Sequence, residues 1–261
     1  MFTRAIVREP GRNFAEGLTS VELGAPEFEL ALRQWEEYCL ALELCGLRLM
    51  RLEAEMRYPD STFVEDTAVI TEHLAMLSRP GAASRRGEVG AIAGVVRGFY
   101  PEAAKISAPG TLDGGDICEA GRHFFLGISR RTNDEGARQL AEHLGREGYS
   151  ASCVDVRGMS SILHLKSGIS YIGPGPSGES TLLVMEEMAD WPAFAGYDLL
   201  RVSADESYGA NCVRVNERVL VAKGCPELVK ELARRGYDLL ELDMSEFRKM
   251  DGGLSCLSLR F

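Results

Sequence analysis

Five polar side chains interrupt apolar runs of this chain at regular intervals, and their types could support nucleophilic catalysis. These marker residues are Asp66, Asp116, His164, Asn211 and Cys256, with successive spacings of 50, 48, 47 and 45 residues. A cysteine thiolate is a strong nucleophile, and a histidine can serve as base and then as acid. Surrounding carboxylates would repel an anionic substrate and suit a guanidinium, whose forked N–H donors match a carboxylate. The pattern predicts thiol chemistry on a cationic substrate if the five positions meet in space.

Each residue also has an ordinary structural interpretation. A free cysteine often behaves as a small buried hydrophobe, and a lone buried histidine is more often structural. Asp113 and Asp116 could simply fit a turn around Gly114-Gly115. His164 alone among the four histidines interrupts an apolar strand-like run, and its spacing with Cys256 favours chemistry. Unrelated hairpins with a coincidental spacing are the alternative.

A repeating unit surrounds each marker residue: an apolar strand, a turn, a second apolar strand and usually an amphipathic helix. Helices are expected over residues 84–100, 134–145 and 226–236. The fifth unit stops at Phe261, soon after Cys256, and the N-terminal region offers the missing parts, a strand over 3–8 and a helix over 26–47. Repeats that close on themselves favour a radial array around a central channel. We expect the marker residues to line that channel.

Two further segments carry residues suited to ligand binding. The glycine pair Gly252-Gly253 precedes Cys256, and an alternating strand follows it. We expect the glycines to let the backbone approach a ligand closely. Arginines occur in segments 84–86 and 129–133, at matching places in the first two units. They could clamp a substrate carboxylate, or they could be solvated surface charge.

The composition excludes several classes of protein. The 261 residues are 45% hydrophobic and 26% charged, as in soluble globular proteins, and no linker divides them, so we expect a single catalytic domain over residues 1–261. The net charge of −10 argues against a nucleic-acid or anionic-membrane partner. No apolar run approaches the ~20 residues that cross a bilayer. Seven cysteines without a C-x-x-C pair argue against a disulfide framework and favour the cytoplasm.

The motifs resemble those of the dimethylarginine dimethylaminohydrolases, members of the guanidino-group-modifying superfamily with the pentein fold. The resemblance covers essentially the whole chain and implies an α/β fold, a five-bladed α/β propeller of pseudo-fivefold ββαβ-type repeats around a central channel, with the last blade closed by both termini. The matching motifs are Gly17-Leu18-Thr19-Ser20, Pro59-Asp60-Ser61-Thr62-Phe63-Val64-Glu65-Asp66, Ser78-Arg79-Pro80-Gly81-Ala82-Ala83-Ser84-Arg85-Arg86-Gly87-Glu88, Thr111-Leu112-Asp113-Gly114-Gly115-Asp116, Arg131-Thr132-Asn133, Leu163-His164-Leu165-Lys166, Ala210-Asn211-Cys212 and Asp251-Gly252-Gly253-Leu254-Ser255-Cys256.

The resemblance implies a hydrolase that converts Nω-methylated arginines, asymmetric dimethylarginine and monomethylarginine, to L-citrulline plus dimethylamine or methylamine. Cys256 would form a covalent thiouronium intermediate, His164 would act as acid and base, and Asp113 would orient that histidine. The implied substrate contacts are Asp66 with help from Glu65 for the guanidinium, Asp60 for the α-amino group, Arg85 and Arg131 for the α-carboxylate, Leu18 from a loop that closes over the ligand, and Met250 beside the nucleophile.

The alternatives are an arginine or agmatine deiminase-like activity and an inactive guanidino-compound-binding protein. Deiminases typically carry an aspartate two residues after the histidine, whereas this chain has Lys166, which cannot accept a guanidinium hydrogen bond. The loss of that carboxylate fits a methylated nitrogen with fewer donors. Some family members have glutamate where this chain has Asp113, and others have valine or isoleucine at the position of Met250.

The expected partner is a small guanidino amino acid. No cofactor is expected, because thiolate and imidazole suffice, although zinc could bind Cys256 and His164 as an inhibitor. A homodimer is one arrangement among several that the sequence leaves open, as is the preference between mono- and dimethylarginine.

Overall fold

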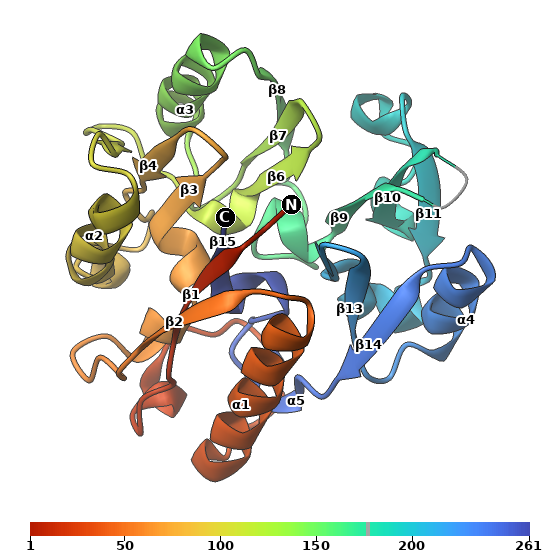
Figure 1. Ribbon diagram of the computed structural model, residues 1–261, viewed down its shortest axis with the longest axis horizontal. Helices are drawn as coiled ribbons and strands as arrows, with labels where there is room; N and C mark the ends of the chain where they lie inside the picture. The colour runs from red at the N-terminus through yellow and green to blue at the C-terminus, as the bar shows by residue number, and fades with distance from the viewer. Residues whose placement is uncertain (176–177) are drawn as a thin grey trace.

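The computed structural model describes residues 1–175 and 178–261, which form five small sheets around one axis (Figure 1). In each sheet the middle strand pairs antiparallel on one side and parallel on the other. The sheets are β15 (Ser258–Arg260), β1 (Arg4–Arg8) and β2 (Arg48–Leu52); β3 (Ala68–Ile70), β4 (Ala75–Leu77) and β5 (Ala104–Lys105); β6 (Ile117–Ala120), β7 (His123–Ile128) and β8 (Ser150–Asp155); β9 (Ile169–Pro174), β10 (Ser180–Met185) and β11 (Asp198–Val202); and β12 (Val213–Val215), β13 (Arg218–Ala222) and β14 (Asp238–Leu242).

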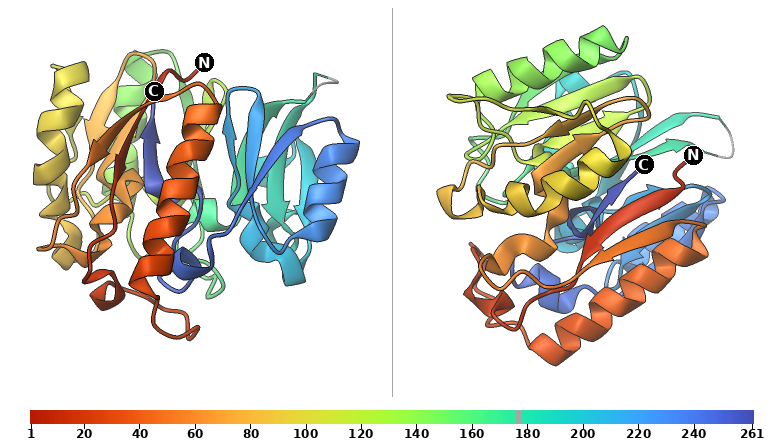
Figure 2. Two further views of the ribbon diagram at one scale, coloured as in Figure 1. Left: turned by 60° about the horizontal axis from the view of Figure 1, so that its bottom comes forward. Right: turned by 60° about the vertical axis from the view of Figure 1, so that its left-hand side comes forward.

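The connections follow from the two kinds of pairing. Short connections join the antiparallel neighbours that are consecutive in the chain, and described residues at positive φ in them include Gly121 at 70°, Gly178 at 95° and Asn216 at 56°. Parallel neighbours need a longer crossover, usually a helix. The crossover helices are α1 (Phe28–Leu44), α2 (Glu88–Phe99), α3 (Asp134–Arg146) and α4 (Pro226–Arg234), and the fourth sheet uses the short 3₁₀ helices η7 (Glu186–Met188) and η8 (Pro192–Phe194). The α-helices lie on the outside of the ring (Figures 1 and 2).

The hydrophobic core fills the space between each sheet and its crossover. In α3 the buried residues Ala137, Leu140 and Leu144 recur at helical spacing and pack with Phe124 and Leu126 of β7. Each such leucine stabilises the fold by roughly 1.5–3 kcal/mol. This packing leaves the ends of the first strands near the axis, where polar side chains gather.

Pairing of the two ends of the chain completes the ring. Strand β1 pairs antiparallel with β15, with Ile6 opposite Leu259, and parallel with β2. The prediction that N-terminal elements complete the fifth unit is therefore confirmed, as is the five-bladed α/β propeller. The views of Figure 2 place both termini at the same end of the axis.

Local boundaries differ from the prediction: the helix expected over 26–47 spans Phe28–Leu44, and two differences lie close to the predicted site residues. The helix expected from residue 84 begins at Glu88, because the short 3₁₀ helix η4 (Ala83–Arg85) precedes it. The closing strand starts at Ser258, since residues 255–257 form another 3₁₀ turn. A short helix, α5 (Ser245–Arg248), lies ahead of that turn. Within the described residues, no helix combines the length and the apolar character needed to cross a membrane.

Candidate active site

Short 3₁₀ helices near the axis position the marker residues. Such a helix has three residues per turn, so consecutive side chains point in directions about 120° apart. Asp66 lies in η3 (Val64–Thr67), Asp116 ends η5 (Gly114–Asp116), His164 precedes η6 (Leu165–Ser167), Asn211 follows η9 (Ala204–Ala210), and Cys256 lies in η10 (Ser255–Leu257). One residue of register therefore decides what each side chain faces.

Most of the predicted site residues line one small pocket of about 20 Å³. A methylated arginine is far larger than this volume, so its entry requires side chains or loops to move. The lining consists of Leu18, Asp60, Phe63, Asp66, Arg85, Arg131, Leu163, His164, Met250, Asp251, Gly252 and Cys256. The structure thus brings His164 and Cys256 to the same pocket, whereas Asp113 lies behind the histidine and Glu65 faces elsewhere.

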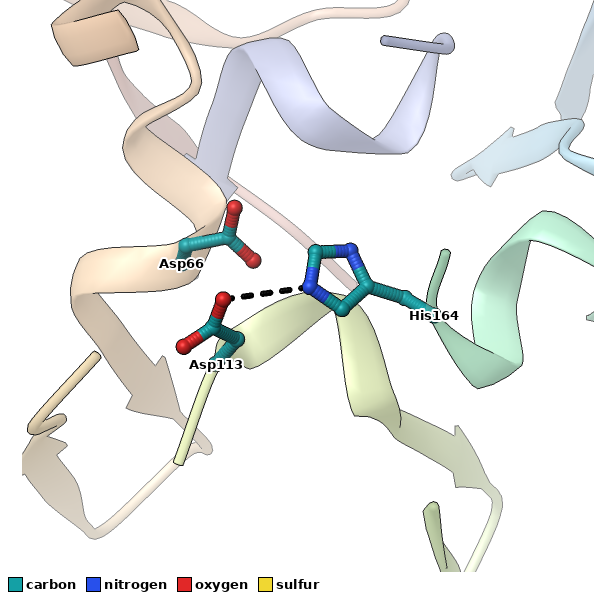
Figure 3. A group of neighbouring side chains, drawn as sticks. All are labelled: Asp66, Asp113 and His164. Atoms are coloured by element: carbon teal, nitrogen blue, oxygen red, sulfur yellow. Dashed lines mark hydrogen bonds and ion pairs between the residues drawn. The ribbon is translucent and has the colours of Figure 1, made fainter. Parts of the chain in front are cut away.

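His164 and Asp113 form a buried pair (Figure 3). The imidazole Nε2 lies 3.1 Å from Asp113 Oδ2, and Asp113 Oδ1 accepts a hydrogen bond from the Gly81 backbone at 2.8 Å. Burial alone would lower the pKa of His164, but the carboxylates of Asp66, Asp116 and Asp113 raise that pKa to about 9. The imidazole is therefore protonated at neutral pH and can donate a proton.

Cys256 lies in a region that disfavours its thiolate. Burial and the carboxylates of Glu65 and Asp66 raise the pKa of the thiol to about 12. The Gly253 N–H donates to Sγ at 3.4 Å and Lys166 adds positive charge, and both oppose that rise. A cation bound next to the thiol would further favour its deprotonation.

The two glycines before Cys256 have a packing role that the sequence analysis did not predict. A side chain at Gly252 would lie 2.3 Å from the Phe63 ring, and one at Gly253 would lie 2.5 Å from Asn211 Oδ1. Close approach to other parts of the protein therefore requires glycine here, and because Gly252 also lines the small pocket, the close approach to a ligand stays a prediction. The residue at positive φ is instead Asp251, at 57°.

Arg85 is a buried hub of ion pairs. Its Nη1 contacts Asp66 Oδ2 at 2.5 Å, its Nε and Nη2 donate to Glu88 at 3.0 and 2.8 Å, and Nη2 also donates to the Phe63 carbonyl. Burial would lower the pKa of Arg85, but Asp66 and Glu88 raise it well above its usual value. Its Nε and Nη2 donors are therefore used within the protein. The predicted contact with an α-carboxylate would rely on Nη1.

Arg131 differs from Arg85 in having donors to spare. Its Nη1 is buried without a hydrogen-bond partner among the described residues, and lies 3.7 Å from Asp113 Oδ2. A buried, unpaired donor costs free energy that a ligand acceptor can recover. The Arg131 backbone packs against Gly81, where a side chain would lie 2.3 Å from the Arg131 carbonyl oxygen. This packing aims a partly exposed guanidinium into the pocket.

Glu65 does not lie where the prediction placed it. Its carboxylate forms an ion pair with Lys166, accepts a hydrogen bond from Ser255 Oγ at 2.9 Å, and lies 3.7 Å from Arg260. These four residues line a second cavity of about 850 Å³, which both termini also border. Because Glu65 and Asp66 are consecutive in a 3₁₀ turn, they face different cavities. The predicted help of Glu65 in holding a guanidinium is not supported by this geometry.

A loop after η1 (Phe14–Glu16) covers the pocket. The Leu18 N–H donates to both oxygens of Asp60, at 3.0 and 3.2 Å, and Leu18 is 41% exposed. Burial raises the pKa of Asp60. Ser20 donates to Asp251 Oδ2 through its N–H at 2.6 Å and its hydroxyl at 3.0 Å. These bonds link the loop to the segment that carries Cys256.

Three polar residues that the sequence analysis gave no role help to build the site. They are Glu88, which pairs with Arg85; Ser255, which bonds to Glu65 and Asn211; and Asp251, which holds Ser20. The spacing of Glu88 three residues after Arg85 was a signal for an ion pair. The other two contacts are non-local and leave no such signal.

One group of described residues has its ligand atoms close enough for a metal ion: Asp66, Asp113 and His164, within 4.8 Å of one another. The positive charges of His164 and Arg85 already balance these carboxylates. Although burial would raise the pKa of Asp66, these two cations lower it to about 2. The arrangement fits proton transfer better than metal binding. A zinc ion on Cys256 and His164 stays a prediction.

Comparison with known proteins identifies close relatives, although no family model matches the chain. The N(G),N(G)-dimethylarginine dimethylaminohydrolase of Pseudomonas aeruginosa is 44% identical over 262 residues, which cover 100% of both chains. The enzyme of the same name from Streptomyces coelicolor is 34% identical over 259 residues, 98% of this chain and 96% of the relative.

Comparison with solved structures also identifies relatives of this chain. A mutant of the Pseudomonas aeruginosa protein, with serine in place of a cysteine and complexed with citrulline, matches with a TM-score of 0.94 at 43% identity over 100% of both chains. The N-terminal domain of a cyanobacterial arginine dihydrolase matches with a TM-score of 0.85 over 98% of this chain and 97% of that one, at 18% identity, and so shares the fold.

Proposed function

Because this chain belongs to the dimethylarginine dimethylaminohydrolase family, we propose that it hydrolyses Nω-methylated arginines to L-citrulline and methylamine or dimethylamine. The observation that carries the proposal most directly is the convergence of Cys256, the His164–Asp113 pair and Arg131 on one pocket. This set offers a nucleophile, a protonated imidazole and a cation for a carboxylate.

The first half of the reaction forms a covalent intermediate. A guanidinium bound next to Asp66 adds positive charge near the thiol, which loses its proton to solvent. The Cys256 thiolate attacks the guanidinium carbon and forms a C–S bond. His164 donates its proton to the methylated nitrogen, the C–N bond breaks, and the amine leaves. A thiouronium and a neutral imidazole remain.

The second half restores the enzyme. The neutral imidazole accepts a proton from water as the oxygen attacks the thiouronium carbon. The C–S bond breaks, the thiolate leaves, and the remaining hydroxyl proton passes by way of solvent to the thiolate, so that the product is the neutral urea of L-citrulline and the thiol is restored. Asp113 orients the imidazole and stabilises its cation through both steps.

Arg131 anchors the α-carboxylate in this scheme, and Asp60 and the loop at Leu18 enclose the α-amino end. The anchor favours an amino acid over agmatine, which has no carboxylate. Lys166 is paired with Glu65, away from the small pocket, and offers no acceptor for a further guanidinium N–H. That pairing favours a methylated substrate over arginine.

A substrate panel tests the proposal. The purified chain is supplied with asymmetric dimethylarginine, monomethylarginine, arginine and agmatine, and citrulline and amine release are measured. We expect citrulline and dimethylamine from the first substrate, and little turnover of arginine. Faster turnover of arginine, or none of any substrate, would overturn the proposal.

A matched pair of cysteine variants tests the nucleophile. Cys256→Ser should abolish turnover and the acid-trapped covalent adduct, which mass spectrometry would detect on the wild-type chain. Cys153→Ser changes an exposed cysteine outside the small pocket and should leave both unchanged. An adduct on Cys256→Ser would refute the assignment.

The same proposal extends to the setting of the enzyme. All five sheets contribute to the axis, so the whole chain would act as one catalytic domain. The seven cysteines are free, which suits the reducing cytoplasm. A homodimer stays a prediction for solution scattering to test.

A further inference from the structure

Two buried marker residues, Asp116 and Asn211, are absent from the lining of both cavities, yet each bonds to the backbone next to a catalytic group. Asp116 Oδ1 accepts the N–H of Leu165 at 3.0 Å, and Asn211 Oδ1 accepts the N–H of Ser255 at 3.0 Å. Resting on the function proposed above, we infer that they are positioning residues: Asp116 orients His164, and Asn211 orients Cys256.

Asp116 connects both partners of the acid–base pair. Its Oδ2 accepts the Ser129 hydroxyl at 2.7 Å, and Ser129 Oγ accepts the Thr132 N–H at 3.1 Å. Thr132 Oγ1 in turn accepts the Asp113 N–H at 3.0 Å. One inaccessible carboxylate thus fixes the backbone beside His164 and, through two hydroxyls, the backbone of Asp113. The 3.1 Å contact between imidazole and carboxylate depends on both connections.

The Ser129 hydroxyl also reaches the substrate anchor. It accepts the Arg131 N–H at 2.9 Å, next to the Thr132 bond. The proton donor and the carboxylate anchor therefore share one rigid support. Displacements of about 1 Å can cost as much as 100-fold in rate, so such a support has functional weight.

Asn211 does the corresponding work for the nucleophile. Its Nδ2 donates to the Lys166 carbonyl at 2.8 Å and to Ser255 Oγ at 3.1 Å, while Oδ1 accepts the Ser255 N–H. The amide packs against Gly253, whose own N–H donates to Cys256 Sγ. Only an amide supplies both donors and an acceptor in this shape. It therefore connects the turns that carry Cys256 and His164.

These contacts are parts of a ring around the axis. Asp66 Oδ1 accepts the Gly115 N–H of the second repeat at 2.8 Å, Asp116 and Asn211 make the contacts above, and Ser255 Oγ donates to Glu65 of the first repeat. A ring of this kind could serve stability alone. The two roles differ in one respect: positioning predicts that each variant disturbs its own catalytic group.

The experiment compares Asp116→Asn and Asn211→Ala with Ser170→Ala. The Ser170 hydroxyl donates to the carbonyls of Ala210 and Cys212, on either side of Asn211, so its loss weakens the same segment without touching the Ser255 N–H. Three readouts are measured on each folded protein: kcat and KM, the imidazole titration of His164 by NMR, and the pH-dependent rate of Cys256 alkylation by iodoacetamide.

We expect Asp116→Asn to lower kcat by about tenfold or more with little change in KM, and to shift the His164 titration to lower pH. Its Cys256 alkylation should stay within about twofold of wild type. Asn211→Ala should change the alkylation rate by about tenfold and leave the titration in place. Ser170→Ala should change neither, whatever it costs in stability.

The inference fails if the two variants lose activity only in proportion to their loss of stability, which is the behaviour expected of Ser170→Ala. It also fails if each variant disturbs the His164 titration and the Cys256 alkylation equally. If Asp116→Asn does not fold, the wild-type chain still gives an answer. The Leu165 amide resonance should titrate with Asp116, near pH 6, together with a small step in the His164 shifts. Absence of that step at Leu165 would refute the contact. Alkylation and titration need no substrate, so their failure is distinct from failure of the proposed function.

Discussion

Asp66 and Asp116 occupy corresponding places in neighbouring repeats, and yet their pKa values shift in opposite directions. Both are almost fully buried, and one oxygen of each accepts a backbone N–H of the following repeat. The other oxygen of Asp66 contacts the Arg85 guanidinium, and the other oxygen of Asp116 accepts a hydrogen bond from the Ser129 hydroxyl. Their pKa values are about 2 and about 6, on either side of the usual 3.8.

The comparison shows what a buried carboxylate needs in order to stay ionised. Burial raises the pKa of both groups. For Asp66 two cations, His164 and Arg85, reverse that rise. For Asp116 the charge of His164 and neutral hydrogen-bond donors only reduce it. The same backbone geometry thus leads to opposite pKa shifts, because Arg85 contacts Asp66 in the first repeat, whereas Arg131 lies near Asp113 and not Asp116 in the second.

The largest effect should come from removing that arginine. Arg85→Met leaves Glu88 buried without its cation and leaves Asp66 with only His164, which costs about 3–5 kcal/mol. Urea unfolding at neutral pH measures this free energy. The control Arg86→Met changes an exposed neighbour and should cost under about 1 kcal/mol. Equal losses in the two variants would contradict the hub role of Arg85.

The next largest effect on the free energy of unfolding should come from Asp66→Asn. The depressed pKa of Asp66 stabilises the fold above its usual value of 3.8, and this contribution is lost as pH falls through about 2. The variant should therefore cost about 2–3 kcal/mol at pH 7 and progressively less below about pH 4. Urea unfolding at several pH values tests this, and a penalty independent of pH would argue against an ionised Asp66.

The effect of Asp116→Asn on the free energy of unfolding should depend on pH in the opposite direction. The raised pKa means that the contribution of Asp116 to stability is complete below 3.8 and is lost as pH rises through about 6. Between about pH 4 and pH 7, the stability of wild type relative to the variant should fall by on the order of 2 kcal/mol. A rise over that range would show that Asp116 is ionised as readily as Asp66.

The smallest effect should come from Ser129→Ala. Loss of its buried bond to Asp116 should cost about 1 kcal/mol and raise the pKa of Asp116 further. Ser161→Ala, which removes an exposed hydroxyl bond to Glu187, is the matched control and should change the free energy of unfolding by under about 0.5 kcal/mol. Urea unfolding of Ser129→Ala and of Ser161→Ala, each compared with wild type, measures the two free-energy changes.

The repeat and the convergence of its marker residues could be predicted from the sequence, but the direction of each side chain could not. The spacing of polar interruptions predicted five units, and the lack of a complete fifth unit predicted the pairing of the chain ends. Asp116 and Asn211 were expected in the channel, whereas they point sideways to the next repeat. A 3₁₀ turn rotates the side chain by about 120° per residue, and apolar periodicity does not record that rotation.

The two arginines illustrate the same limit. Arg85 and Arg131 lie at matching places, and each has an acid three residues later, Glu88 and Asp134. Glu88 is buried against Arg85, while Asp134 is 79% exposed and lies near Arg157. The sequence alone could not distinguish the paired arginine from the one with an unused donor, because the difference depends on how the following helix packs.

The pairing of β1 with β15 has a consequence for how the molecule folds. Four of the five sheets draw their strands from short stretches of chain, as β6, β7 and β8 do, and such local contacts form early and quickly. The sheet next to Cys256 instead brings together segments from opposite ends of the described chain, at the entropic cost of closing a long loop. We expect that sheet to form late in folding, so recovered activity would report closure of the ring.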